Sequence, residues 1–220
     1  MTQVSRYAPR CLGLLIALAS PAIGRAQGTP AGLDPATAAI IAPIVEQAKA
    51  THLPVEFLYV KAREGQVRRA PLAAIASAVR ALAQRLRSAS EALAPTPSDE
   101  ELRAAADAMH QGVPVETLRE MRRAGGDGSL VVPLGVLTQL VARGVPVEKA
   151  SLRIVDLLER GAVPRNFIAL EESVREDVML GKRPEESLDL RLKGIFPNLP
   201  QPGTNADAGG LQANTPKRPR

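Results

Sequence analysis

The chain contains GVPVETLREMRRAG at residues 112–125 and GVPVEKASLRIVDLLERG at residues 144–161. Both stretches begin with the same five residues, and both end on glycine. Proline is well tolerated in the first turn of a helix, where its missing N–H has no partner, and glycine supplies the left-handed conformation that ends a helix. Each stretch therefore predicts one short amphipathic helix together with its start and stop signals.

Similar helix start signals, each with a proline, recur along most of the chain. These prolines are Pro54, Pro71, Pro114, Pro133, Pro146, Pro164 and Pro184. The spacing of these prolines is irregular, so they do not define a repeat of fixed period. Duplicated hairpins and unrelated helices with similar end signals are alternative explanations. In either case the predicted fold class is all-α, with short antiparallel helical hairpins packed as an irregular bundle or a solenoid-like array.

One long helix is predicted at residues 71–94. Its apolar residues recur at spacings of three and four through about three heptads. Such a stripe packs against a neighbouring helix, either within the chain, which is the commoner arrangement, or across a homodimer. The stripe consists of Leu72, Ile75, Val79, Leu82, Leu86, Ala89 and Leu93.

Capping residues place further helix starts. Asp34 is expected to cap a helix running to about Lys49, with Pro43 inside it causing a kink or a restart. Ser98 and Glu101 form a capping box for a helix running to about Gln111. The other predicted helices span 114–124, 133–143, 146–160, 164–180 and a segment at 187–196 that frays into an extended exit.

The N-terminus has the pattern of an export signal. Arg6 and Arg10 precede a short apolar run, and small residues suit cleavage after Ala26. Residues 1–26 are therefore predicted to be a signal peptide of a bacterial protein that is periplasmic or secreted, and a buried N-terminal helix is the alternative. No transmembrane segment is expected after cleavage.

The remaining chain divides into a helical domain and a tail. The domain is predicted at 27–196, with candidate lobes 34–94 and 98–196 on either side of a hinge at 94–98. Residues 197–220 have little apolar content and many helix breakers, so they are predicted to be a disordered tail. This tail ends in the basic residues Lys217, Arg218 and Arg220.

No catalytic, cofactor-binding or metal-binding residue is predicted. Cleavage would remove the single cysteine, Cys11. His52 and His110 lie at predicted helix ends, where a cation is favoured by the helix dipole. An acidic group on one helix is interpreted as a solvated surface, with calcium binding or acid–base catalysis as the alternatives. This group contains Glu171, Glu172, Glu176 and Asp177.

Charge is unevenly distributed along the chain. Residues 61–90 contain seven bases and one acid, whereas residues 98–195 contain 17 acids and 14 bases. A basic helix can bind an anionic partner or be merely solvated. Nucleic acid is not expected, because no aromatic residues interleave with the arginines to stack on bases. The candidate anionic-partner surface consists of Arg68, Arg69, Arg80, Arg85 and Arg87.

These features predict a non-catalytic protein-interaction or scaffold module of the cell envelope, with an envelope protein as its partner. The alternative is a peripheral binder of anionic lipid or cell-wall polymer that uses the basic 61–90 region. A third hypothesis, an enzyme with an unrecognised carboxylate site, requires that mutation of Glu172 or Glu176 abolish a specific activity.

Overall fold

A computed structural model of the chain describes residues 32–199, and this part is all-helical, with no strand. The predicted signal peptide at 1–26 and residues 200–220 of the predicted tail lie outside the described residues. The helices are α1 (Pro35–Ala50), α2 (Glu56–Val67), α3 (Leu72–Ala92), α4 (Asp99–His110), α5 (Val115–Gly125), α6 (Val131–Ala142), α7 (Val147–Glu159), α8 (Pro164–Met179), α9 (Pro184–Ile195) and the 3-10 helix η1 (Phe196–Asn198).

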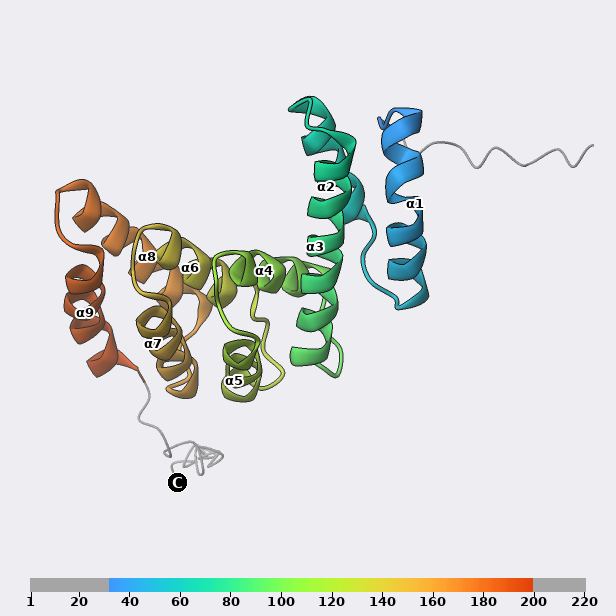
Figure 1. The fold of residues 1–220 in the computed structure, drawn as a ribbon. Coiled ribbons are helices and arrows are strands. Elements are labelled where there is room, and N and C mark those ends of the chain that lie inside the picture. Colours follow the sequence, from blue (N-terminus) through green and yellow to red (C-terminus); the bar gives the residue numbers. More distant parts are fainter. Residues whose placement is uncertain (1–31, 200–220) are drawn as a thin grey trace, which may run out of the picture.

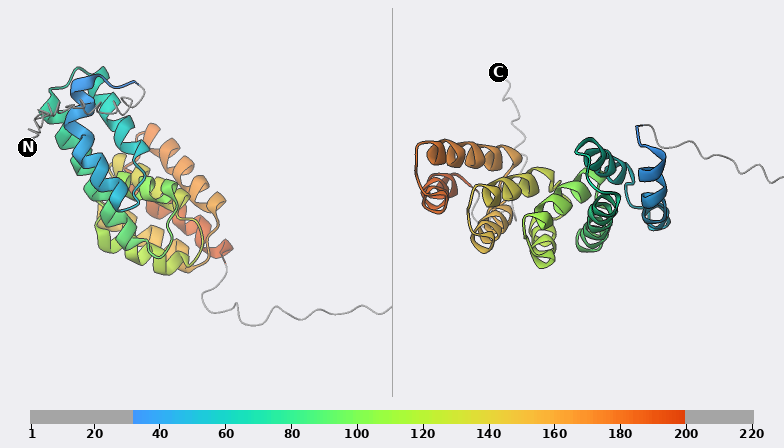
Figure 2. Two further views of the ribbon diagram at one scale, coloured as in Figure 1. Left: turned by 90° about the vertical axis from the view of Figure 1, so that its right-hand side faces the viewer. Right: turned by 45° about the horizontal axis from the view of Figure 1, so that its top comes forward.

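The helices follow one another along the molecule, from α1 at one end to α9 at the other (Figure 1). Helix α3 packs against α1, α2, α4 and α5. Beyond it, α4, α6 and α8 form one row of neighbours, and α5, α7 and α9 lie in a second row beside it (Figures 1 and 2). The division into two lobes with a hinge at 94–98 stays a prediction.

Six helices end in the same hydrogen-bonded turn. After α6, the N–H of Gly144 donates to the carbonyl of Val141, and the N–H of Val145 donates to the carbonyl of Leu140. These two bonds satisfy carbonyls at the helix end, and they require that the donor of the first bond, here Gly144, adopt a left-handed conformation. That residue is glycine after α4, α6, α7 and α8, but it is His52 after α1 and Arg69 after α2.

The position of proline after these turns differs from the prediction. Pro114 and Pro146 are N-cap residues, and the helix begins one residue later. Of the prolines that follow these turns, Pro164 and Pro184 occupy the first helical position, as Pro35 does at the start of α1. In both positions the missing N–H of proline removes no hydrogen bond within the helix.

The apolar stripe of α3 is buried within the chain. Ile75, Val79, Leu86 and Ala89 are buried and Leu82 is half-buried, whereas Leu72 is 41% exposed. The buried side chains of all nine α-helices in the described range form one core cluster, dominated by Ala, Leu, Val and Ile. This core needs few aromatic residues because small side chains let the helices approach closely.

Some local features differ from the prediction. Of the kink or restart expected at Pro43, the restart does not occur: helix α1 continues through this proline, which faces solvent, where water solvates the carbonyl that loses its N–H partner. The exit after residue 187 is not extended, because α9 runs to Ile195 and η1 follows. Leu199 is buried, so the folded part continues beyond the predicted tail boundary at 197.

Candidate functional site

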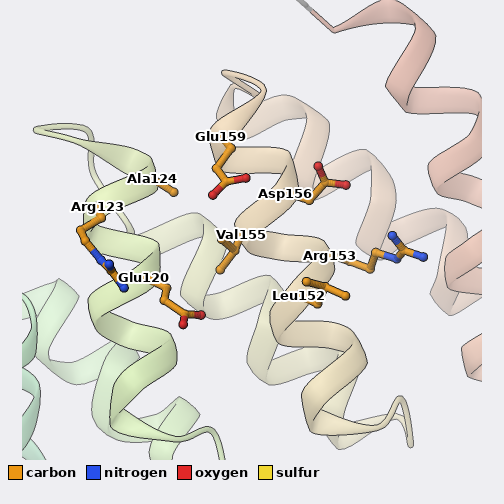
Figure 3. Close-up of a pocket in the computed structure, with 8 residues that line it drawn as sticks. All are labelled: Glu120, Arg123, Ala124, Leu152, Arg153, Val155, Asp156 and Glu159. Carbon is orange, nitrogen blue, oxygen red and sulfur yellow. The ribbon is translucent and has the colours of Figure 1, made fainter. Parts of the chain in front are cut away.

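An open groove of about 780 Å³ lies between α5 and α7 (Figure 3). Its position follows from the two-row arrangement, which places α5 and α7 side by side although they are separated in sequence by α6. Each helix buries its opposite side, through Leu118 and Met121 on α5 and through Ile154 and Leu157 on α7. The outward sides of the two helices remain available to a partner.

The floor of the groove is apolar, and its rim carries charges of both signs, with the exposed Arg123 on α5 one helical turn from Glu120. Ala124 and Val155 are half-buried between the two helices. Glu120 from α5 and Glu159 from α7 lie on facing sides of the groove (Figure 3). Both carboxylates are exposed, and neither makes an ion pair or hydrogen bond with any described residue. The groove thus offers two carboxylates that make no ion pair with a described residue, with the cation of Arg123 on the α5 side, around an apolar strip.

The other side of α7 extends the surface toward α9. Leu152 is 63% exposed there and lines the edge of the groove. Next to it, Lys149 makes ion pairs with Glu185 at 2.8 Å and with Asp189 at 2.7 Å. Arg153 lies 3.6 Å from Asp189. These cations are already paired with carboxylates of α9, so among the described residues the charged groups of this surface without an ion pair are Glu120, Glu159 and Arg123.

The predicted basic surface does not form one face. Arg68 and Arg69 lie in the exposed α2–α3 turn. Arg80 and Arg87 lie two helical turns apart on one side of α3, whereas Arg85 is on another side and lines a pocket with α2 and α4. None of the five guanidinium groups makes an ion pair with a described residue. The structure therefore separates them into a turn, a helix side and a pocket.

The acidic group on α8 is likewise divided. Glu171 pairs with Arg143 at 2.6 Å, and Asp177 is buried, while Glu172 and Glu176 are exposed. Among the described residues, no group of three or more His, Cys, Asp or Glu side chains is arranged to hold a metal ion. His52 occupies the left-handed position after α1, and His110 is the last residue of α4, at the ends where the sequence places them.

Asp177 is the centre of a buried polar network that joins α8 to α9. Its carboxylate accepts hydrogen bonds from Arg191 at 2.7 and 2.8 Å, from Lys182 at 2.8 Å and from Ser187 at 2.6 Å. These contacts, with Arg191 contributing most, hold the pKa of Asp177 far below its usual range. This arrangement fixes the last described hairpin and leaves no free oxygen for chemistry.

The carboxylate of Glu101, at the start of α4, likewise joins separate segments of the chain through hydrogen bonds. Besides closing the capping box with Ser98, its carboxylate accepts from the buried N–H of Leu130 at 2.8 Å and from Arg122 at 2.7 Å. Burial alone raises the pKa of Glu101, but the hydrogen bonds from Leu130, Ser98 and Arg122 outweigh it and lower the pKa. The sequence reveals the capping box, but not the contacts with α5 and α6.

Comparison with known proteins gave no match to a family model, a curated protein or a solved structure. Among the described residues, no helix is long and apolar enough to cross a membrane.

Proposed function

We propose that the protein is a non-catalytic interaction module of the cell envelope, in which an array of helical hairpins forms a scaffold and the α5–α7 groove binds a protein partner. The pair of carboxylates without an ion pair to a described residue, Glu120 and Glu159, around the apolar strip of Ala124 and Val155 carries this proposal. The exposed Leu152 adds apolar area at the edge of the groove.

The groove defines the chemistry of that partner. A segment with basic side chains on both sides of an apolar residue would neutralise Glu120 and Glu159 while covering Val155. Charge pairs at an interface gain most where a partner excludes water from them, and the apolar strip provides such a place. The partner segment is therefore basic and amphipathic, and the envelope is its compartment if residues 1–26 direct export.

The test uses the purified chain as bait for solubilised envelope proteins. We expect the wild type to retain a specific protein and the Glu120→Lys, Glu159→Lys double variant to bind it about tenfold more weakly, because reversed charges repel a basic segment. The matched control is Glu172→Lys, Glu176→Lys, which makes the same charge change on the exposed side of α8. Equal retention by all three baits would exclude the groove as the interface.

A second candidate function is peripheral binding to an anionic lipid surface. In the α2–α3 turn, the bases Arg68 and Arg69 are exposed between Val67, which is 82% exposed, and Leu72, which is 41% exposed. Apolar side chains next to unpaired cations match the interface of an anionic bilayer, where each basic residue contributes about 1 kcal/mol. The turn supports this candidate better than the whole 61–90 region does, because the other arginines point elsewhere.

Vesicle sedimentation tests the second candidate. Vesicles with one-third anionic lipid are expected to bind the wild type more strongly than vesicles of neutral lipid, and Arg68→Gln, Arg69→Gln is expected to reduce this binding by about tenfold. Raising the salt concentration should abolish it, because exposed charges are screened. Binding that resists salt, or that the Arg80→Gln control weakens equally, would argue against a role for the turn.

A further inference from the structure

A small pocket of about 90 Å³ lies where α2, α3 and α4 meet. Arg85 enters it from α3, beside the apolar side chains of Leu82 and Leu86. Phe57 contributes from α2, and His110 from the end of α4. This pocket is on a different part of the molecule from the α5–α7 groove, and the proposed partner binding does not use it.

Arg85 is the unusual member of this pocket. Its Nε atom is buried and has no hydrogen-bond partner among the described residues. Buried side-chain donors are nearly always hydrogen-bonded, because the lost interaction with water must be replaced. Arg87 has the same unpartnered atom but lies two residues further on, roughly 200° around the helix from Arg85. A ligand acceptor that enters the pocket would satisfy Arg85 alone.

The charges around Arg85 favour an anion. Lys61 is paired with Glu64 at 3.0 Å, and Arg103 lies 4.0 Å from Asp107. Within each pair the two charges neutralise each other. The charge of Arg85 therefore remains without a compensating carboxylate among the described residues. A guanidinium group presents Nε and a terminal nitrogen as two parallel donors, which match the two oxygens of a carboxylate.

A second groove of about 410 Å³ lies beside this pocket, between α4 and α6, and its lining is mainly apolar but includes Glu100 and Asp107. Phe57, Arg103 and Asp107 line both spaces, and Arg103 is stacked over the Phe57 ring at 5.4 Å. Further along, the floor is made of small residues, Ala104 and Gly135. A Cβ atom at Gly135 would meet no atom within 4 Å, so this glycine leaves the groove open rather than permitting close helix packing.

We propose that the pocket and the adjoining groove together bind a small amphiphilic carboxylate. Its head group accepts hydrogen bonds from Arg85, and its hydrocarbon part passes Phe57 and covers Ala104 and Gly135. The class of ligand is a medium-chain acid, because the head space is small and the apolar groove is short and open. Binding of this ligand does not depend on the α5–α7 groove.

Calorimetric titration of the purified chain tests the proposal with octanoate, its neutral analogue octanamide and inorganic phosphate. Octanoate is expected to bind at least about tenfold more tightly than either of the others, because only octanoate offers both a charge and a chain. Equal affinity for octanamide would overturn the role of the charge, and equal affinity for phosphate would overturn the role of the chain.

Three variants locate the site. Arg85→Gln is expected to weaken octanoate binding at least about tenfold, whereas Arg80→Gln, on another side of the same helix, should leave it unchanged. Gly135→Leu should weaken octanoate binding without disturbing the fold, since space is present and the helix propensity improves. Circular dichroism and thermal melting establish that each variant is folded. Octanoate binding that survives both Arg85→Gln and Gly135→Leu would overturn the proposal.

Discussion

The Asp177→Ala variant is expected to melt roughly 5–10 °C below the wild type, because it removes a buried carboxylate that accepts several hydrogen bonds. Removal of this buried side chain leaves the hydroxyl of Ser187 without its acceptor and separates two cations from their counter-charge. These groups belong to α8, α9 and the turn between them, so the loss falls on the last described hairpin.

The pH dependence of stability gives an independent check. The pKa of Asp177 is lower in the folded chain than its ordinary value, so the unfolded chain binds more protons. The stabilisation is therefore complete above about pH 4, the pKa of an unperturbed aspartate, and is lost as the pH falls below it. Thermal melting between pH 7 and pH 2 should show a steeper decline for the wild type than for Asp177→Ala.

Glu172→Ala is the control, because Glu172 is exposed on the same helix and makes no hydrogen bond or ion pair with a described residue. Its melting temperature should equal that of the wild type within about a degree, as for most surface substitutions. Parallel pH profiles for the wild type and Asp177→Ala would show that the network does not supply the acid-sensitive stability.

Replacement of Glu101 by alanine is expected to destabilise the chain by about 2–4 kcal/mol. The change removes the carboxylate that accepts from the backbone N–H of Ser98 in the capping box, which is worth about 1 kcal/mol, and leaves the buried N–H of Leu130 without an acceptor, which costs about 1–3 kcal/mol. Chemical denaturation monitored by circular dichroism measures the difference.

Two further variants separate the contributions of Glu101. Ser98→Ala removes the hydroxyl that caps α4 but leaves the carboxylate in contact with Leu130 and Arg122, so it should cost only about 1 kcal/mol. Glu101→Gln keeps one acceptor oxygen and should lie between the two alanine variants. If Ser98→Ala were as destabilising as Glu101→Ala, the contact with Leu130 would contribute nothing.

The helices could be predicted from the sequence because their limits depend on local signals. The GVPVE stretches and the capping box of Ser98 and Glu101 act within a few residues, and the structure places helix ends within one or two residues of them. The apolar stripe of α3 also predicted a buried side, but not which helices cover it. A stripe specifies that a side is buried, and only the whole fold selects its neighbours.

The candidate sites could not be predicted in the same way, because they depend on contacts between distant segments. Glu120 and Glu159 face one groove only because α5 lies beside α7. Asp177 was grouped with exposed acids on α8, yet Arg191, fourteen residues further on, holds it in the interior. Arg85 was grouped with four other arginines by sequence density, and the geometry of α3 separates it from them.

The two-row arrangement also determines how the molecule can come apart. Each helix packs mainly on helices near it along the molecule, so loosening can begin at the last described helices, α8 and α9, and travel inward. The Asp177 network lies at this vulnerable position, where α8 and α9 have α6 and α7 on one side only. Its hydrogen bonds hold α8 and α9 together at the end of the described chain, where apolar neighbours pack against these helices from one side only.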